Sequence, residues 1–146
     1  MNAPMSMAIA KPAQSYEAWR ISPGDSNRLA LIFDPLADGA NFIAAVEIFD
    51  HGGCTPPNQH AVGQEMFFVL KGEGRARCDG QTIDVRAGDS LLLKPGTTHE
   101  LHNTGPGRLY CLTIMVPDDQ FAALIRSGVR AELDAEDLDV LGRLGR

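Results

Sequence analysis

The segment TPPNQHAVGQE, residues 55–65, places an asparagine, a histidine and a glutamate between two apolar runs. The runs at 42–49 and 66–70 have the composition of buried β-strands. Polar residues between two such strands fit an ordinary surface loop, and they also fit a group of metal ligands. Gly63 predicts a turn within the segment, which would place Glu65 at the start of the following strand.

The middle of the chain predicts an all-β domain. Asp79-Gly80 is a strong hairpin signal, because the tight turn needs positive φ. Gly88-Asp89 and Pro95-Gly96 mark two further turns. Short strands separated by glycine turns at this spacing are typical of an antiparallel sandwich or barrel. The strands are predicted at 42–49, 66–70, 75–78, 82–87, 91–93 and 109–116, with the last in a central position.

The end of the chain predicts short helices rather than strands. Pro117 ends the last strand, Asp118 is a candidate helix cap, and a second helix is expected from Asp134. The apolar positions that would share a helix face are Phe121, Leu124 and Ile125 in the first helix and Leu138, Leu141 and Leu144 in the second. The predicted boundaries are a flexible tail at 1–14, the β-barrel at 15–116 and C-terminal helices packed on the barrel at 117–146.

Composition and charge exclude several classes of function. The chain has 146 residues, the size of one domain, and a formal net charge of −6. Because no cluster of Lys or Arg is present, neither nucleic acid nor an anionic membrane surface is an expected partner. The first residues lack the pattern of a secretory signal, and no segment has the length of a membrane span. The 3 cysteines, without a C-x-x-C pair, predict free thiols and a cytoplasmic location.

Strand parity predicts which polar side chains share a face. Alternate residues of a strand point to the same side, about 6.6–6.8 Å apart, so Asn58 and His60 would both face the barrel interior. Glu65, at the start of the next strand, would share its face with Phe67. His99 follows another glycine turn and enters a further strand. If these strands are neighbours, two imidazoles and a carboxylate converge inside the barrel.

Two imidazoles and one carboxylate on one side of a cation form a metal site whose opposite side stays open. This donor set suits Fe(II), and also Mn, Ni, Co or Zn. The residues His60, Glu65 and His99 therefore predict one divalent transition metal without identifying it.

The spacing of these residues resembles the first motif of the cupin superfamily. That motif is a glycine, five residues, His-x-His, three or four residues, a glutamate, six residues and a glycine. Here Gly52 is followed by five residues, then Asn58-Gln59-His60, four residues, Glu65, six residues and Gly72.

A second family motif follows in the expected order. It is a glycine, five residues, Pro-x-Gly, two residues, a histidine, three residues and an asparagine. Here Gly88 is followed by five residues, Lys94-Pro95-Gly96, two residues, His99, three residues and Asn103, with a lysine at the position of the proline. Two motifs in order are far more specific than either alone. The resemblance implies a small single-domain cupin of the cupin 2 type, a double-stranded β-helix (jelly-roll) barrel that holds a metal and forms a homodimer.

Asn58 departs from the family pattern, because it occupies the position of the first metal-binding histidine. An amide oxygen is a harder and weaker donor than an imidazole nitrogen, so affinity for late transition metals should fall. Two outcomes remain open: a three-ligand site with Asn58 as a distant fourth ligand, or a pocket without metal in which Asn58 joins a hydrogen-bonded cluster. Since the other three ligands are all retained, we expect metal binding.

The resemblance implies two classes of function. The first is a metal-dependent enzyme that acts on a small organic molecule, of the dioxygenase, isomerase or lyase type. The second is a non-catalytic protein that binds a metal or a small ligand. No second acid or base is identifiable by spacing, which weakens the enzyme hypothesis. The candidate pocket residues are Phe67, Tyr110 and Asn103. Packing explains Phe67 and Tyr110 equally well, and Asn103 more often orders a turn or a strand end than contacts a substrate.

Overall fold

The chain is described by a computed structural model that covers residues 7–142. The strands are β1 (Glu17–Arg20), β2 (Asn27–Phe33), β3 (Ile43–Phe49), β4 (Gln64–Lys71), β5 (Glu73–Cys78), β6 (Gln81–Arg86), β7 (Ser90–Leu93), β8 (His99–Asn103), β9 (Leu109–Val116) and β10 (Val129–Ala131). The helices are the 3₁₀ turn η1 (Ala13–Ser15), α1 (Pro35–Asp38), α2 (Phe121–Arg126) and α3 (Ala135–Gly142).

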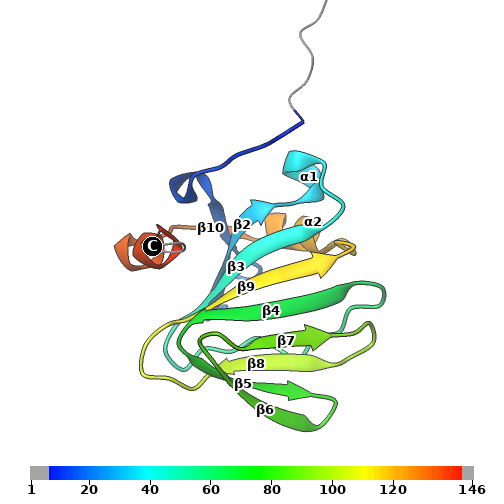
Figure 1. Cartoon of the computed structure of the whole chain (residues 1–146), viewed down its shortest axis with the longest axis vertical. Helices are drawn as coiled ribbons and strands as arrows, with labels where there is room; N and C mark the ends of the chain where they lie inside the picture. The colour runs from blue at the N-terminus through cyan, green and yellow to red at the C-terminus, as the bar shows by residue number, and fades with distance from the viewer. Residues whose placement is uncertain (1–6, 143–146) are drawn as a thin grey trace, which may run out of the picture.

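Within the described residues, the strands form two antiparallel sheets (Figure 1). The seven-stranded sheet has the order β10-β1-β2-β3-β9-β4-β7, and the three-stranded sheet has the order β6-β5-β8. The predicted all-β class is confirmed, and each predicted strand is present with its ends shifted by at most a few residues. Each helix within residues 7–142 is too short or too polar to span a bilayer.

The hairpin and central-strand predictions are confirmed in detail. Asp79 and Gly80 have φ of 49° and 82°, and they join β5 to β6. The strand β9 lies between β3 and β4, which makes it central. All residues of β3 are buried, as expected for a strand covered on both faces.

The main core lies between the two sheets. Buried side chains from β3, β4 and β9 pack there against those of β5, β6 and β8. Gly72, at the junction of β4 and β5, shows why one motif glycine is needed. Its φ is +99°, and a Cβ at this position would lie 2.8 Å from the carbonyl oxygen of Arg108. A side chain there would force β4 away from the loop before β9.

The C-terminal segment contains the two predicted helices and one element that was not predicted. The helix α2 packs Ala122 and Ile125 against the barrel, and Asp118 accepts a hydrogen bond of 2.8 Å from the backbone N–H of Ala122. Between the helices, β10 extends the large sheet by pairing with β1. The prediction of helices alone over 117–146 is therefore incomplete. The periodic signal failed because a three-residue edge strand is too short to show alternation.

Part of the predicted flexible tail is anchored. Residues 1–6 and Leu144 lie outside the described residues. Lys11 donates a hydrogen bond of 2.8 Å to the Ile32 carbonyl and forms an ion pair of 2.8 Å with Asp38. A single long side chain therefore connects this segment to β2 and α1, and the flexibility of the tail stays a prediction.

Candidate metal centre

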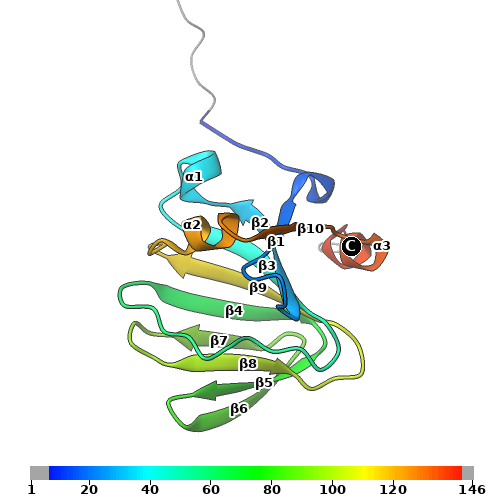
Figure 2. The same ribbon diagram turned by 180° about the vertical axis from the view of Figure 1, so that it is seen from behind.

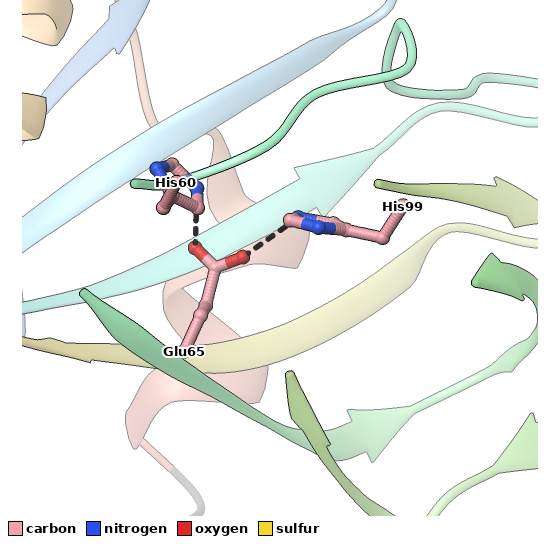
Figure 3. A group of neighbouring side chains, drawn as sticks. All are labelled: His60, Glu65 and His99. Atoms are coloured by element: carbon pink, nitrogen blue, oxygen red, sulfur yellow. Dashed lines mark ion pairs between the residues drawn. The ribbon is translucent and has the colours of Figure 1, made fainter. Parts of the chain in front are cut away.

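Three side chains from separate parts of the chain meet at one point (Figure 3). His60 comes from the loop before β4, Glu65 from the start of β4, and His99 from the start of β8. One ligand atom of each lies within 4.8 Å of the others. Figure 3 shows the Glu65 carboxylate between the two rings, with Oε2 3.7 Å from His60 Nε2 and Oε1 3.0 Å from His99 Nε2.

The position of Glu65 follows from the sheet register. It pairs with Leu93 of β7 and with Met115 of β9, so its backbone is held on both sides. Glu65, Phe67 and Val69 are buried, whereas Phe68, which has the opposite parity, is exposed. Strand parity therefore predicted the direction of the carboxylate correctly.

The loop that carries His60 is fixed to β8 and to the turn before it. Asn58 and His99 exchange backbone hydrogen bonds of 2.9 and 2.8 Å, and the N–H of Gly96 donates to the His60 carbonyl at 2.9 Å. Figure 2 shows this segment running along β8. Directly opposite residues of an antiparallel pair share a face, so the Asn58 side chain lies on the same face as His99.

The protonation of His99 suits a cation at its Nε2 atom. Nδ1 lies 3.1 Å from the carbonyl oxygen of Thr97, which can only accept, so Nδ1 carries the proton. Burial disfavours the charged ring, but the hydrogen bond and negative charge of Glu65 outweigh it, and the pKa of His99 is raised. In the absence of metal, a proton on Nε2 therefore occupies the place that a cation would take.

The Nε2 atom of His60 shows whether His60, Glu65 and His99 are suited to hold a metal ion. Its Nε2 atom is buried, and within the described part of the chain it has no hydrogen-bond partner. Buried polar atoms in folded proteins nearly always have one. A divalent cation among the ligand atoms of His60, Glu65 and His99 would satisfy this nitrogen, so the donor set fits a transition metal.

Asn58 lies at the edge of this group. Its Nδ2 atom donates to the carbonyl oxygen of Pro56 at 3.2 Å, and the side chain is half-buried. Among the described residues, no hydrogen bond joins its amide to His60, Glu65 or His99. Its place on the same face as His99 supports the expectation of a distant fourth ligand, which stays a prediction.

A cavity of about 550 Å³ opens beside the three candidate ligands. This volume is within the range of small-molecule sites. Phe67 lines one wall, and Phe121 of α2 covers His60 with an edge-on contact of 5.5 Å between ring centroids. The first C-terminal helix therefore forms part of the site, in addition to packing on the barrel.

Glu47 is a cavity residue that sequence reasoning missed. It lies on β3, is 5% exposed, and accepts a short hydrogen bond from the Asn27 amide. Burial, and then the negative charge of Glu65, raise the pKa of Glu47 to about 8, although the Asn27 hydrogen bond opposes the shift. The available signal was a single carboxylate in the otherwise apolar run FIAAVEIF. Glu47 is a candidate for the second acid or base that spacing did not reveal.

Two of the three predicted pocket residues do not line this cavity. Phe67 does. Tyr110 lies on the other face of β9, where its hydroxyl donates to Asp137 at 2.8 Å, and the prediction is wrong because strand parity turns it away. Asn103 donates from Nδ2 to the carbonyl oxygens of Phe49, Asp50 and Gly107. It therefore orders loops, as its alternative interpretation proposed.

Comparison with known sequences identifies relatives of this chain. The model of a family described as "Cupin domain" matches residues 45–115. An uncharacterized protein of Methanocaldococcus jannaschii is 26% identical over 83 residues, which are 56% of this chain and 66% of that protein. The oxalate-binding protein of Thermotoga maritima is 29% identical over 59 residues, 40% of this chain and 49% of that protein. The matches thus span only part of each relative.

Solved structures with the same fold cover more of the chain. A predicted oxalate decarboxylase from Thermotoga maritima superposes with a TM-score of 0.67 and 21% identity, over 75% of this chain and 99% of that one. An RmlC-like cupin from Shewanella frigidimarina has a TM-score of 0.64 and 18% identity, over 77% and 93%. KdgF from a Halomonas species has a TM-score of 0.60 and 17% identity, over 71% and 91%. At these identities the likeness shows the jelly-roll fold alone.

Proposed function

Because the chain belongs to the cupin superfamily, we propose that it binds a divalent transition metal through His60, Glu65 and His99 and acts on a small organic molecule in the adjoining cavity. One observation carries the proposal: the buried Nε2 atom of His60 lacks a hydrogen-bond partner within the described residues and points toward two other metal-type ligands. The metal is Fe, Mn, Ni, Co or Zn, since the donor set suits all of them.

The cavity residues have separate roles in this proposal. A bound metal would polarise an oxygen atom of the small molecule. Phe67 and Phe121 would shield that molecule from water, because they form apolar walls beside the ligands. Glu47 would accept or hold a proton, since it is a buried carboxyl with a pKa raised to about 8. Activity assays distinguish the possible reaction classes, which are oxygenation, isomerisation and elimination.

Metal analysis of a ligand variant tests the first half of the proposal. The protein is stripped with a chelator, loaded with each metal in turn, and analysed by mass spectrometry for metal content. We expect one ion per chain, and His60→Ala should weaken binding by at least about 100-fold, because it removes a direct ligand. The matched control is His51→Ala, an exposed histidine outside the cavity. Unchanged metal content in His60→Ala would contradict the ligand assignment.

A non-catalytic binding protein is the second candidate function. The likeness to the oxalate-binding protein of Thermotoga maritima favours it. Oxygen uptake and product formation with iron-loaded protein on catechols, thiols and keto acids separate the two. Turnover supports the enzyme, and saturable binding without turnover supports the binding protein.

We also propose a homodimer in a reducing, cytoplasmic compartment. The outer face of the large sheet exposes Phe68 (38%) and Leu92 (57%) on the neighbouring strands β4 and β7, as an interface between copies would require. The three free cysteines support the compartment. Sedimentation velocity should give the mass of two chains, and Phe68→Lys should give that of one.

A further inference from the structure

The charge on the cavity wall is one-sided. Of the described residues that line it, none is Lys or Arg, and the carboxylates are Asp25, Glu47, Glu65 and Asp119. A divalent metal on two neutral imidazoles and Glu65 would carry one net positive charge. Asp25 and Asp119, when ionised, carry two negative charges, and Glu47, whose raised pKa favours the protonated form, adds a third when it ionises. The wall therefore stays acidic even with the metal bound.

Two of these carboxylates lie on the side of the cavity formed by the large sheet. Glu47 belongs to β3, and Asp25 belongs to the turn between β1 and β2, where it accepts a hydrogen bond of 3.0 Å from the N–H of Ser22. Asn27 connects them, because it is two residues from Asp25 and pairs with the Glu47 carboxylate. The charge of Asp25 also contributes to the raised pKa of Glu47, so the two carboxylates are close enough to interact.

Glu47 lacks a positive partner within the described residues. Its recorded side-chain hydrogen bond comes from the neutral Asn27 amide, and it is 5% exposed. A buried carboxylate is normally paired with a cation. Elsewhere in this chain buried carboxylates are paired in this way, as Asp34 is with Arg126 at 2.6 Å. Because burial raises the pKa of Glu47 to about 8, the carboxyl is protonated near neutral pH in the empty cavity, and a cationic group of a bound molecule would favour its ionised form.

We propose that the cavity binds an organic molecule carrying a positively charged amine, with its oxygen donors toward the metal and its amine toward Asp25 and Glu47. The site then selects against a carboxylate of the same shape, because anionic ligands have no Lys or Arg to contact among the lining residues. Phe67 and Phe121 provide apolar contact for the carbon skeleton between the two ends. This inference rests on the proposed function, since the metal fixes the oxygen end of the ligand.

Three catechols that differ at one ring substituent, which is cationic, neutral or anionic, test the proposal. They are 3,4-dihydroxyphenethylamine, 4-ethylcatechol and 3-(3,4-dihydroxyphenyl)propanoate, which share the same metal-chelating oxygens. Their dissociation constants for the Zn(II)-loaded protein are measured by calorimetry, because zinc does not support redox turnover. Each is normalised to binding of the same catechol by free Zn(II). We expect the amine to bind at least about tenfold more tightly than the carboxylate, with the neutral compound between them.

Variants locate the source of the preference. Glu47→Gln and Asp25→Asn each remove one acidic group of the cavity and should lower the amine-to-carboxylate ratio to about threefold or less. Two variants are measured so that, if one of them misfolds, the other still tests the proposal. The control is Glu132→Gln, an exposed carboxylate outside the cavity, which should leave the ratio unchanged.

The outcomes separate the inference from the proposed function. Zinc content is measured before each titration, and failure of the wild-type chain to hold zinc overturns the proposed function and the inference with it. Zinc-loaded protein that binds the three catechols equally, or prefers the carboxylate, overturns the inference alone. An amine preference that survives in both variants also overturns it, since the preference then has another source.

Discussion

Two buried polar clusters lie on opposite faces of the same central strands, and they differ in how fully they are satisfied. On the outer face, both carboxylate oxygens of Asp137 accept two hydrogen bonds: Oδ1 from Tyr110 (2.8 Å) and Arg108 (3.0 Å), and Oδ2 from Arg28 (2.6 Å) and the Asp134 backbone (3.1 Å). Among the described residues of the inner face, the buried Nε2 of His60 and Oγ1 of Thr113 have no hydrogen-bond partner.

The difference separates a structural role from a functional one. The Asp137 carboxylate accepts four hydrogen bonds and has no capacity left for a ligand, although the Nε atom of Arg28 beside it has no hydrogen-bond partner, so Asp137 fixes α3 to the barrel. The inner cluster holds polar atoms without hydrogen-bond partners close to several carboxyl groups. This arrangement lowers the stability of the fold, and such arrangements are found where a bound ligand supplies the missing contacts. Variants of the two clusters test this difference, and their expected effects decrease from Asp137 to Thr113.

Removing the centre of the outer cluster should have the largest effect. Asp137→Ala leaves the buried Arg28 with only the partly exposed carboxylate of Asp50 and is expected to lower the free energy of unfolding by about 3–5 kcal/mol. Urea denaturation followed by circular dichroism measures it. Glu132→Ala, an exposed carboxylate nearby in sequence, should change stability by less than about 0.5 kcal/mol. If the folded Asp137→Ala variant loses its metal affinity, the two clusters are not independent.

Glu47 should make stability depend on pH in the metal-free protein. Because its pKa rises from 4.5 to about 8 on folding, the folded state binds more protons in that window. The free energy of unfolding should therefore fall as pH rises from about 5 to 8, by about 2–4 kcal/mol.

Glu47→Gln isolates this contribution. His99, whose pKa is also raised, loses its stabilising proton as pH rises and adds to the same decline. The difference between the wild-type and Glu47→Gln curves removes that common part. Parallel curves over pH 5 to 8 would show that Glu47 does not titrate in this range.

Restoring the family ligand should strengthen the inner site. Asn58→His places an imidazole on the face shared with His99 and is expected to tighten Zn(II) or Ni(II) binding by about tenfold. Gln14→His is the matched control, because Gln14 is exposed and lies outside the cavity. Competition with a chromogenic chelator measures both. Equal affinity in Asn58→His and the wild-type chain would mean that position 58 does not face the ion.

Thr113 gives the smallest expected change. Its hydroxyl is buried on the inner face without a partner within the described residues. Thr113→Val keeps the shape and removes the unpaired group, so the free energy of unfolding should rise by about 1 kcal/mol. Thermal denaturation measures it. A loss of stability would show that the hydroxyl has a partner in solution, such as water.

The sequence allowed the fold and the three candidate ligands to be predicted, because both depend on local patterns. Turn residues set the strand ends, and parity on β4 placed Glu65 beside Phe67. The remaining features depend on long-range packing. Glu47 was missed because nothing near it in the chain shows that β3 borders the cavity. Tyr110 was misplaced because the face that each β9 residue presents depends on how β9 pairs with β3, a strand distant in the sequence.

The most direct measurement is anomalous X-ray diffraction from crystals of the metal-loaded protein, collected on both sides of the metal absorption edge. The account predicts one anomalous peak within coordination distance, about 2.0–2.2 Å, of a nitrogen of His60, a nitrogen of His99 and an oxygen of Glu65. A peak bound elsewhere, or loaded crystals without a peak between these side chains, would contradict it.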